Sequence, residues 1–128
     1  IEESLGTRKK LREVLAEIGW TERNRYFVHA ETDYFLEFPA GPLSVGDEPV
    51  SRISQLAFPT GVLRPLSPTD CVKDRLAAFY HWKDQQSLEQ AVLVARTNEI
   101  DLGDVERWSR KEKSLPRFRA FRSRLAAP

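Results

Sequence analysis

Methionine is absent from this chain of 128 residues, and cysteine and histidine are scarce, with one cysteine and two histidines. The single cysteine, Cys71, cannot form an internal disulfide, which is typical of proteins from reducing compartments. One cysteine and two histidines also exclude the usual tetrahedral zinc site. Because a translated chain needs an initiator, the absence of methionine predicts that Ile1 is not the natural start and that further sequence lies upstream.

Long hydrophobic runs and glycine-rich phosphate motifs are missing as well. No apolar stretch approaches the roughly 20 residues of a membrane-spanning helix. Neither a Walker-type loop nor a Rossmann fingerprint occurs. The composition that remains is ordinary for a globular protein, with 41% hydrophobic and 30% charged residues and a net charge of +1. We therefore expect a single bacterial-type cytoplasmic domain over residues 1–128, with no membrane partner.

The first half of the chain, residues 1–66, predicts one helix and a small antiparallel sheet. Apolar residues recur at helical spacing over residues 7–18. That stripe consists of Leu11, Val14, Leu15 and Ile18. Short aromatic and β-branched runs separated by turn residues then predict two hairpins. Their strands are 26–30 with 34–38 and 52–58 with 61–66, and a further short strand is expected at 43–45. In the strand 34–38 we expect Tyr34, Leu36 and Phe38 to face the core.

The second half, residues 67–128, predicts four helices. Ser67 or Thr69 caps the first, which ends at Lys83-Asp84. The second spans about 87–97, the third follows the cap Asp101, and the fourth spans about 115–125. The expected inward-facing residues are Val72, Leu76, Phe79, Tyr80, Leu88, Ala91, Val92, Ala95, Leu102, Val105, Trp108, Leu115, Phe118, Phe121 and Leu125. The predicted class is therefore α+β, with an N-terminal helix, a small antiparallel sheet of two hairpins and a C-terminal bundle of about four helices.

Charged residues gather at the start of the helix that begins at Pro68. Asp70 and Asp74 are four positions apart, so their carboxylates share one helix face, and Lys73 lies beside both. From composition alone the group is typical of a solvated first turn, because acids are favoured at a helix N-terminus. A functional site is the alternative.

The segment 67–91 carries these residues in a distinctive order. They are Asp70, Lys73, Asp74 and Arg75 around the first helix and Asp84 at its end. This order resembles a segment of polymerase-β-like nucleotidyltransferases, in the bacterial branch that includes abortive-infection-type toxins, and the resemblance extends roughly over residues 5–112. It implies a nucleoside triphosphate substrate, with Lys73 directed at the phosphates and Asp70, Asp74 and Asp84 near the nucleotide. Asp84 is also a natural N-cap for the next helix.

Enzymes of this family hold two divalent ions with three carboxylates, two of which form an Asp-x-Asp or Asp-x-Glu pair after a Gly-Ser motif. Glu37 is the candidate for the third carboxylate, with Asp33 as an alternative, and an ordinary outward-facing glutamate explains the same position. The Gly-Ser motif with its paired acids does not occur in the chain. We therefore expect a Mg²⁺ site only if those acids lie upstream of Ile1, and we expect the chain as given to be an incomplete or non-catalytic nucleotidyltransferase-like domain.

The tail of the chain is basic. Between Arg110 and Arg124 there are seven basic residues and one acid. Arg117, Arg119, Arg122 and Arg124 alternate there with the inward-facing Phe118 and Phe121. Such an excess favours a nucleic acid or a nucleotide phosphate as partner, and a solubilising helix face is the alternative. A non-catalytic binding or regulatory module is accordingly the competing hypothesis for the chain.

Overall fold

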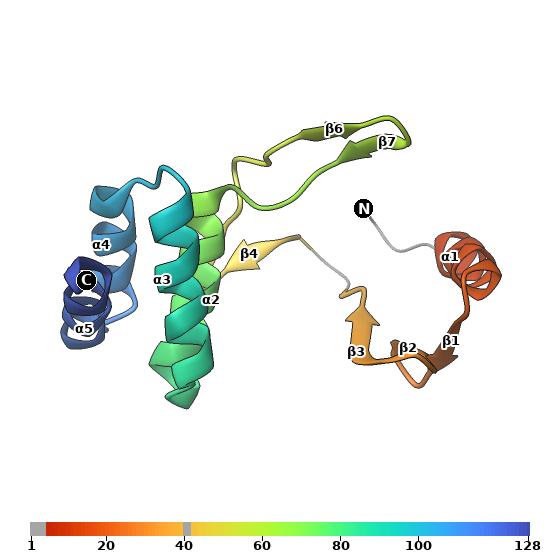
Figure 1. Cartoon of the computed structure of the whole chain (residues 1–128), viewed down its shortest axis with the longest axis horizontal. Helices are drawn as coiled ribbons and strands as arrows, with labels where there is room; N and C mark the ends of the chain where they lie inside the picture. Colours follow the sequence, from red (N-terminus) through yellow and green to blue (C-terminus); the bar gives the residue numbers. More distant parts are fainter. Residues whose placement is uncertain (1–4, 40–41) are drawn as a thin grey trace. The chain divides into compact units, whose positions relative to one another are not determined.

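The computed structural model of the chain describes residues 5–39 and 42–128, and within them the predicted α+β class is confirmed (Figure 1). An N-terminal helix is followed by three small antiparallel sheets and then by four helices. By its internal contacts the chain divides into two compact units after Pro42. The change from strands to helices comes later, at Pro68, close to the predicted boundary after residue 66. The single domain expected for the whole chain stays a prediction.

The described part of the first unit consists of α1 and a three-stranded antiparallel sheet in the order β1-β2-β3. Their bounds are Leu5–Glu17 for α1, Trp20–Arg23 for β1, Tyr26–His29 for β2 and Thr32–Glu37 for β3. The helix and the β2–β3 hairpin confirm the sequence prediction, whereas β1 was not predicted. In β1 the aromatic Trp20 and the β-branched Thr21 are followed by two charged residues, so this run is too short to mark a strand, and its pairing with β2 identifies it.

The apolar faces predicted for the first unit are only partly correct. Phe27 on β2 is fully buried, and Phe38 packs edge-on against it with 5.7 Å between the ring centroids. Tyr34, which was expected in the core, is 83% exposed. The register between β2 and β3 shifts at this point and leaves Tyr34 without a partner residue on β2. On α1, Val14 and Ile18 are exposed, because the small unit buries few side chains.

Two separate two-stranded sheets open the second unit. Their strands are β4 Ser44–Val45 with β5 Glu48–Pro49, and β6 Leu56–Phe58 with β7 Gly61–Leu63. The β6–β7 hairpin was predicted, although its strands are shorter and each of their residues is exposed, and β5 was not predicted. Gly46 turns the chain between β4 and β5 with a φ of 58°, and a Cβ at this position would lie 2.5 Å from Oε1 of Glu112. The positive φ favours glycine at this turn, and a larger residue would displace the carboxylate of Glu112.

Four helices complete the second unit. They are α2 Pro68–Trp82, α3 Gln85–Thr97, α4 Leu102–Lys111 and α5 Leu115–Ala126, and they confirm the predicted bundle. Three of them begin at side-chain caps. The Oγ of Ser67 accepts a hydrogen bond from the backbone N–H of Asp70 at 3.1 Å, and Asp84 and Asp101 cap α3 and α4 in the same way. Lys83 ends α2 in the left-handed conformation, with a φ of 57°.

The core of the second unit lies between these helices. It contains Val72, Leu76, Phe79, Tyr80, Leu88, Ala91, Val92, Val105, Trp108, Phe118 and Phe121, all of which were predicted to face inward. Leu102 was also expected there but is 38% exposed, because it occupies the first position of α4. The rings of Tyr80 and Trp108 stack with 5.6 Å between centroids, and Tyr80 Oη shares a hydrogen bond of 2.8 Å with Ser109 Oγ. Helix α2 therefore packs on α4 through aromatic contacts near the C-terminal end of α2.

Candidate functional site

A polar cavity of about 550 Å³ lies in the second unit, beside β5 and the first turns of α2 and α4. Its acids are Glu48, Asp70, Asp101 and Asp104, its cations are Arg52, Lys73 and Arg107, and its hydroxyl groups belong to Ser51, Ser67 and Thr69. The two helix starts are joined directly, because the backbone N–H of Asp101 donates to Oγ1 of Thr69 at 3.0 Å. The capping residues that begin the helices thus also bring the charged groups together.

Lys73 is the central cation of this cavity. Its Nζ lies 2.6 Å from Asp104, 3.3 Å from Asp70 and 3.7 Å from Glu48, and its side chain is 5% exposed. Burial by itself lowers the pKa of Lys73, but the hydrogen bonds and charges of Asp104 and Asp70 outweigh it, so the pKa is raised. The lysine is therefore charged at neutral pH, and the surrounding carboxylates fix the position of its ammonium group.

Arg107 extends the same interactions along α4. Its two terminal nitrogens donate to the two carboxylate oxygens of Glu48 at 3.0 and 2.8 Å, and the guanidinium also donates to Asp104. These hydrogen bonds lower the pKa of Glu48 and raise that of Arg107. Burial raises the pKa of Asp104, but Lys73 and Arg107 together hold it below its ordinary value. We call the five residues, Glu48, Asp70, Lys73, Asp104 and Arg107, the Lys73 network.

Arg52 is the cation that this network leaves unpaired. It lines the cavity, is exposed, and makes no ion pair with any residue that the structure describes. Sequence analysis did not identify Arg52, Glu48, Asp104 or Arg107 as site residues. Glu48 and Arg107 are 59 positions apart, so no local spacing marks them as partners.

The other acids predicted near Lys73 have different partners. Asp74 pairs with the neighbouring Arg75 and does not line the cavity. Asp84 accepts hydrogen bonds from the backbone N–H of Gln86 at 3.0 Å and from the hydroxyl of Ser87 at 2.7 Å, and these bonds lower its pKa. The structure thus brings Asp70 and Lys73 together in the cavity. Asp84 is the N-cap of α3, which was the alternative interpretation of this residue.

Glu37, the candidate metal ligand, ends β3 in the first unit. Its carboxylate lies 3.3 Å from Nε of Arg25 and is partly exposed. Asp33, the alternative, is the second residue of β3 and has no partner residue on β2, because the register shifts there. Among residues 5–39 and 42–128, no three histidine, cysteine, aspartate or glutamate side chains are grouped so that they could hold a metal ion. The role of Glu37 therefore stays a prediction.

The basic helix α5 presents its arginines unevenly. Arg117 is half-buried, whereas Arg119, Arg122 and Arg124 are exposed. Arg124 lies 3.5 Å from Glu89 on α3, but in the described part of the chain Arg119 and Arg122 have no ionic partner. Since positions three apart are neighbours on a helix, Arg119 and Arg122 form one exposed pair of positive charges.

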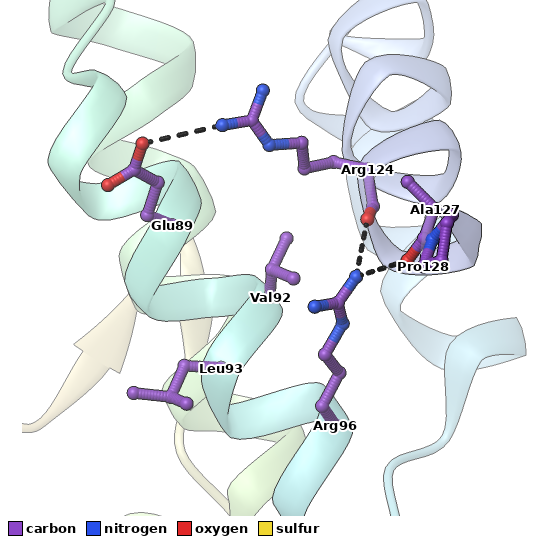
Figure 2. A pocket seen from close by; sticks show the side chains of 7 residues that line it. All are labelled: Glu89, Val92, Leu93, Arg96, Arg124, Ala127 and Pro128. Carbon is purple, nitrogen blue, oxygen red and sulfur yellow. Dashed lines mark hydrogen bonds and ion pairs between the residues drawn. The ribbon is translucent and has the colours of Figure 1, made fainter.

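A second, smaller hollow of about 300 Å³ lies between α3 and α5 (Figure 2). Its apolar residues are Val92, Leu93, Ala127 and Pro128. Arg96 reaches across from α3 and donates to the carbonyl oxygen of Arg124 at 3.1 Å and to that of Ala127. These are carbonyl groups at the C-terminal end of α5, where a cation is favoured by the helix dipole. Arg96 thus has a structural role in holding the two helices together.

Comparisons of the chain with protein-family models, with curated proteins and with solved structures give no match. In the stretches that the structure describes, no helix is long and apolar enough to cross a membrane. The polar cavity and the basic helix α5 are therefore the features that indicate a function.

Proposed function

We propose that this chain is a nucleotidyltransferase-like domain in which the polar cavity binds the phosphates of a nucleoside triphosphate. The observation that supports the proposal most is that three cations from separate segments, Arg52, Lys73 and Arg107, line one cavity of about 550 Å³. That volume is within the usual range for small-molecule sites. Arginine and lysine are the common protein partners of phosphate oxygens. The resemblance of the segment 67–91 points to the same ligand class and to the same lysine.

The acids of the cavity determine the form in which the nucleotide binds. Four carboxylates face three cations, so a free triphosphate meets no excess of positive charge. A triphosphate that carries Mg²⁺ has less negative charge, and its metal ion is attracted by the carboxylates rather than repelled. We therefore expect the magnesium complex to bind, and we expect affinity to fall when Mg²⁺ is removed.

Calorimetric titration with ATP tests this proposal. It is carried out once with excess Mg²⁺ and once with a chelator. Arg52→Gln and Lys73→Gln should each weaken binding by about tenfold, as the loss of a charged hydrogen bond does. Lys83→Gln is the matched control, because Lys83 is exposed, has no ionic partner among the described residues and lies outside the cavity.

The Arg52 variant decides the outcome if Lys73→Gln does not fold, since Lys73, unlike Arg52, neutralises carboxylates of the protein. The proposal fails if the chain shows no saturable ATP binding at millimolar concentration, or if Arg52→Gln binds as tightly as the unaltered chain.

A second candidate function rests on a separate observation, the exposed pair of arginines on α5. We propose that Arg119 and Arg122 contact the phosphates of a nucleic acid. The affinity for a short RNA stem should then fall steeply as the salt concentration rises. Fluorescence titration at three salt concentrations measures this. Replacing both arginines by glutamine should flatten the salt dependence, whereas replacing Arg23 and Lys83, which are exposed and unpaired among the described residues, should not. Equal slopes for the two double variants would exclude this candidate.

A further inference from the structure

Glu48 is surrounded by cations from two helices. Its carboxylate makes a two-pronged contact with Arg107 at 3.0 and 2.8 Å, and it lies 3.7 Å from Nζ of Lys73 and 3.8 Å from Nζ of Lys111. Lys73 belongs to α2, and Arg107 and Lys111 belong to α4. Arginine binds two oxygens of a phosphate with the same paired geometry that it uses for a carboxylate. Glu48 therefore occupies a position that suits a phosphate group.

The charge balance around Glu48 depends on this one carboxylate. The three cations that contact Glu48 are accompanied by the carboxylates of Asp70 and Asp104, which pair with Lys73 and Arg107. With Glu48 present the acids and bases are equal in number. If Glu48 moves away, one positive charge is left in excess, and an anion is needed to balance it.

Glu48 lies on a short hairpin that is held on both sides of its turn. Val45 on β4 is 3% exposed and accepts a hydrogen bond from the indole of Trp108, so the beginning of the β4–β5 hairpin is anchored in the core. Beyond the turn, Val50 packs against the same core, and its backbone N–H donates to the carbonyl oxygen of Leu43 at 3.0 Å. The side chain of Glu48 is nevertheless 27% exposed. It can thus turn away from the cations toward solvent while the backbone of the hairpin stays in place.

We propose that Glu48 is the built-in occupant of an anion site formed by Arg107, Lys73 and Lys111, and that a phosphate group of the ligand replaces it. This inference rests on the proposed function, because it says where in the cavity the phosphate binds and what competes with it. The chain inhibits its own site in the absence of ligand. Binding a phosphate exchanges one set of ionic contacts for another and releases the side chain of Glu48.

Glu48→Gln tests this inference, because the amide keeps the size of the side chain and one oxygen acceptor but removes the charge. Calorimetric titration with pyrophosphate should give a dissociation constant about tenfold lower for Glu48→Gln than for the unaltered chain. Asp47→Asn is the matched control, since Asp47 is the preceding residue, is exposed and has no ionic partner among the described residues. This control removes the same charge without freeing a cation. The affinity of Asp47→Asn for pyrophosphate should therefore stay within twofold of that of the unaltered chain.

The site itself is tested by adding Arg107→Gln to the Glu48→Gln chain, which should abolish the gain in pyrophosphate affinity. If Glu48→Gln binds pyrophosphate no more tightly than the unaltered chain or than Asp47→Asn, the inference is wrong, even where ATP binding through Arg52 and Lys73 supports the proposed function. If no form of the chain binds ATP but Glu48→Gln binds pyrophosphate, the proposed function fails and the anion site stands. If no form binds either compound, both are wrong.

Discussion

The indole nitrogen of Trp108 donates a hydrogen bond to the carbonyl oxygen of Val45, 63 positions earlier in the chain, at a distance of 3.3 Å. Both residues are almost completely buried. The bond satisfies a polar group on each side of the contact and fixes β4 against the helices. Because Glu48 follows Val45 by three positions, the same bond also positions the segment that completes the Lys73 network.

Trp108→Phe should lower the free energy of unfolding by about 2 to 4 kcal/mol, because it leaves the Val45 carbonyl without its donor and opens a cavity beside Tyr80. Urea denaturation followed by circular dichroism measures this change. Trp82→Phe is the control, since Trp82 is 77% exposed and should change stability by less than about 0.5 kcal/mol. Equal stabilities of the two variants would contradict the structural role given to the Trp108–Val45 bond.

The helices of the second unit could be predicted because their signals are local. Ser67, Asp84 and Asp101 stand at the helix starts, where a side-chain oxygen meets a backbone N–H two or three positions ahead. The sheet of the first unit was harder to predict, since a strand such as β1 is defined by a partner strand rather than by its own residues. Tyr34 was assigned to the wrong environment because alternation fails where a register shifts.

Only those contacts of the cavity that join residues close in sequence could be predicted. Asp70 and Lys73 are three positions apart on one helix, so their ion pair follows from helical geometry. The contacts of Lys73 with Glu48 and Asp104 join segments that are distant in sequence, and these depend on how α2, α4 and β5 pack. The role of Arg52 could not be predicted from the sequence, because no motif or spacing distinguishes this arginine from other exposed residues.

The helical phasing of the core predicts the effect of two truncations. Leu76→Ala on α2 and Phe121→Ala on α5 should each destabilise the protein by about 2 to 5 kcal/mol, since both side chains are fully buried and truncation leaves a cavity. Leu93→Ala provides the comparison, because Leu93 is 63% exposed and should change the free energy of unfolding by less than about 0.5 kcal/mol. Chemical denaturation of the three variants is the measurement. A loss below about 0.5 kcal/mol for either core variant would show that the assigned phasing is wrong.

Residues 1–128 should show no magnesium-dependent nucleotidyl transfer. Two-metal transfer in polymerase-β-like nucleotidyltransferases needs three carboxylates, and the sequence offers at most one of them, Glu37 or its alternative Asp33, without the Gly-Ser motif and its paired acids. Incubation with labelled ATP, CTP, GTP and UTP and a panel of RNA, protein and small-molecule acceptors measures this directly. Incorporation that disappears in Glu37→Gln would contradict the expectation and establish the chain as an enzyme.

The charged groups of the Lys73 network predict how stability depends on pH. Hydrogen bonds from Arg107 lower the pKa of Glu48, and Lys73 and Arg107 overcome the effect of burial to lower that of Asp104. A lowered pKa in the folded state stabilises the protein above the ordinary carboxyl pKa, and this contribution is lost as pH falls through the folded value. The pKa of Lys73 is raised, so its contribution is present below its ordinary value of 10.5 and is lost as pH rises further. Stability should therefore decline below about pH 4 and again above about pH 10.5.

Glu48→Gln isolates the contribution of one carboxylate to the loss of stability at low pH. The variant should be less stable than the unaltered chain at pH 7, because Arg107 loses a charged partner. The difference should stay constant from pH 7 to about 5 and shrink as pH falls below the ordinary carboxyl value of 4.5, since the unfolded chain then takes up a proton at Glu48 more readily than the folded chain. Urea midpoints at constant ionic strength, followed by tryptophan fluorescence, give the comparison, and Asp47→Asn should show no difference that changes with pH. A stability gap between Glu48→Gln and the unaltered chain that stays constant down to pH 3 would mean that the charge of Glu48 does not stabilise the fold.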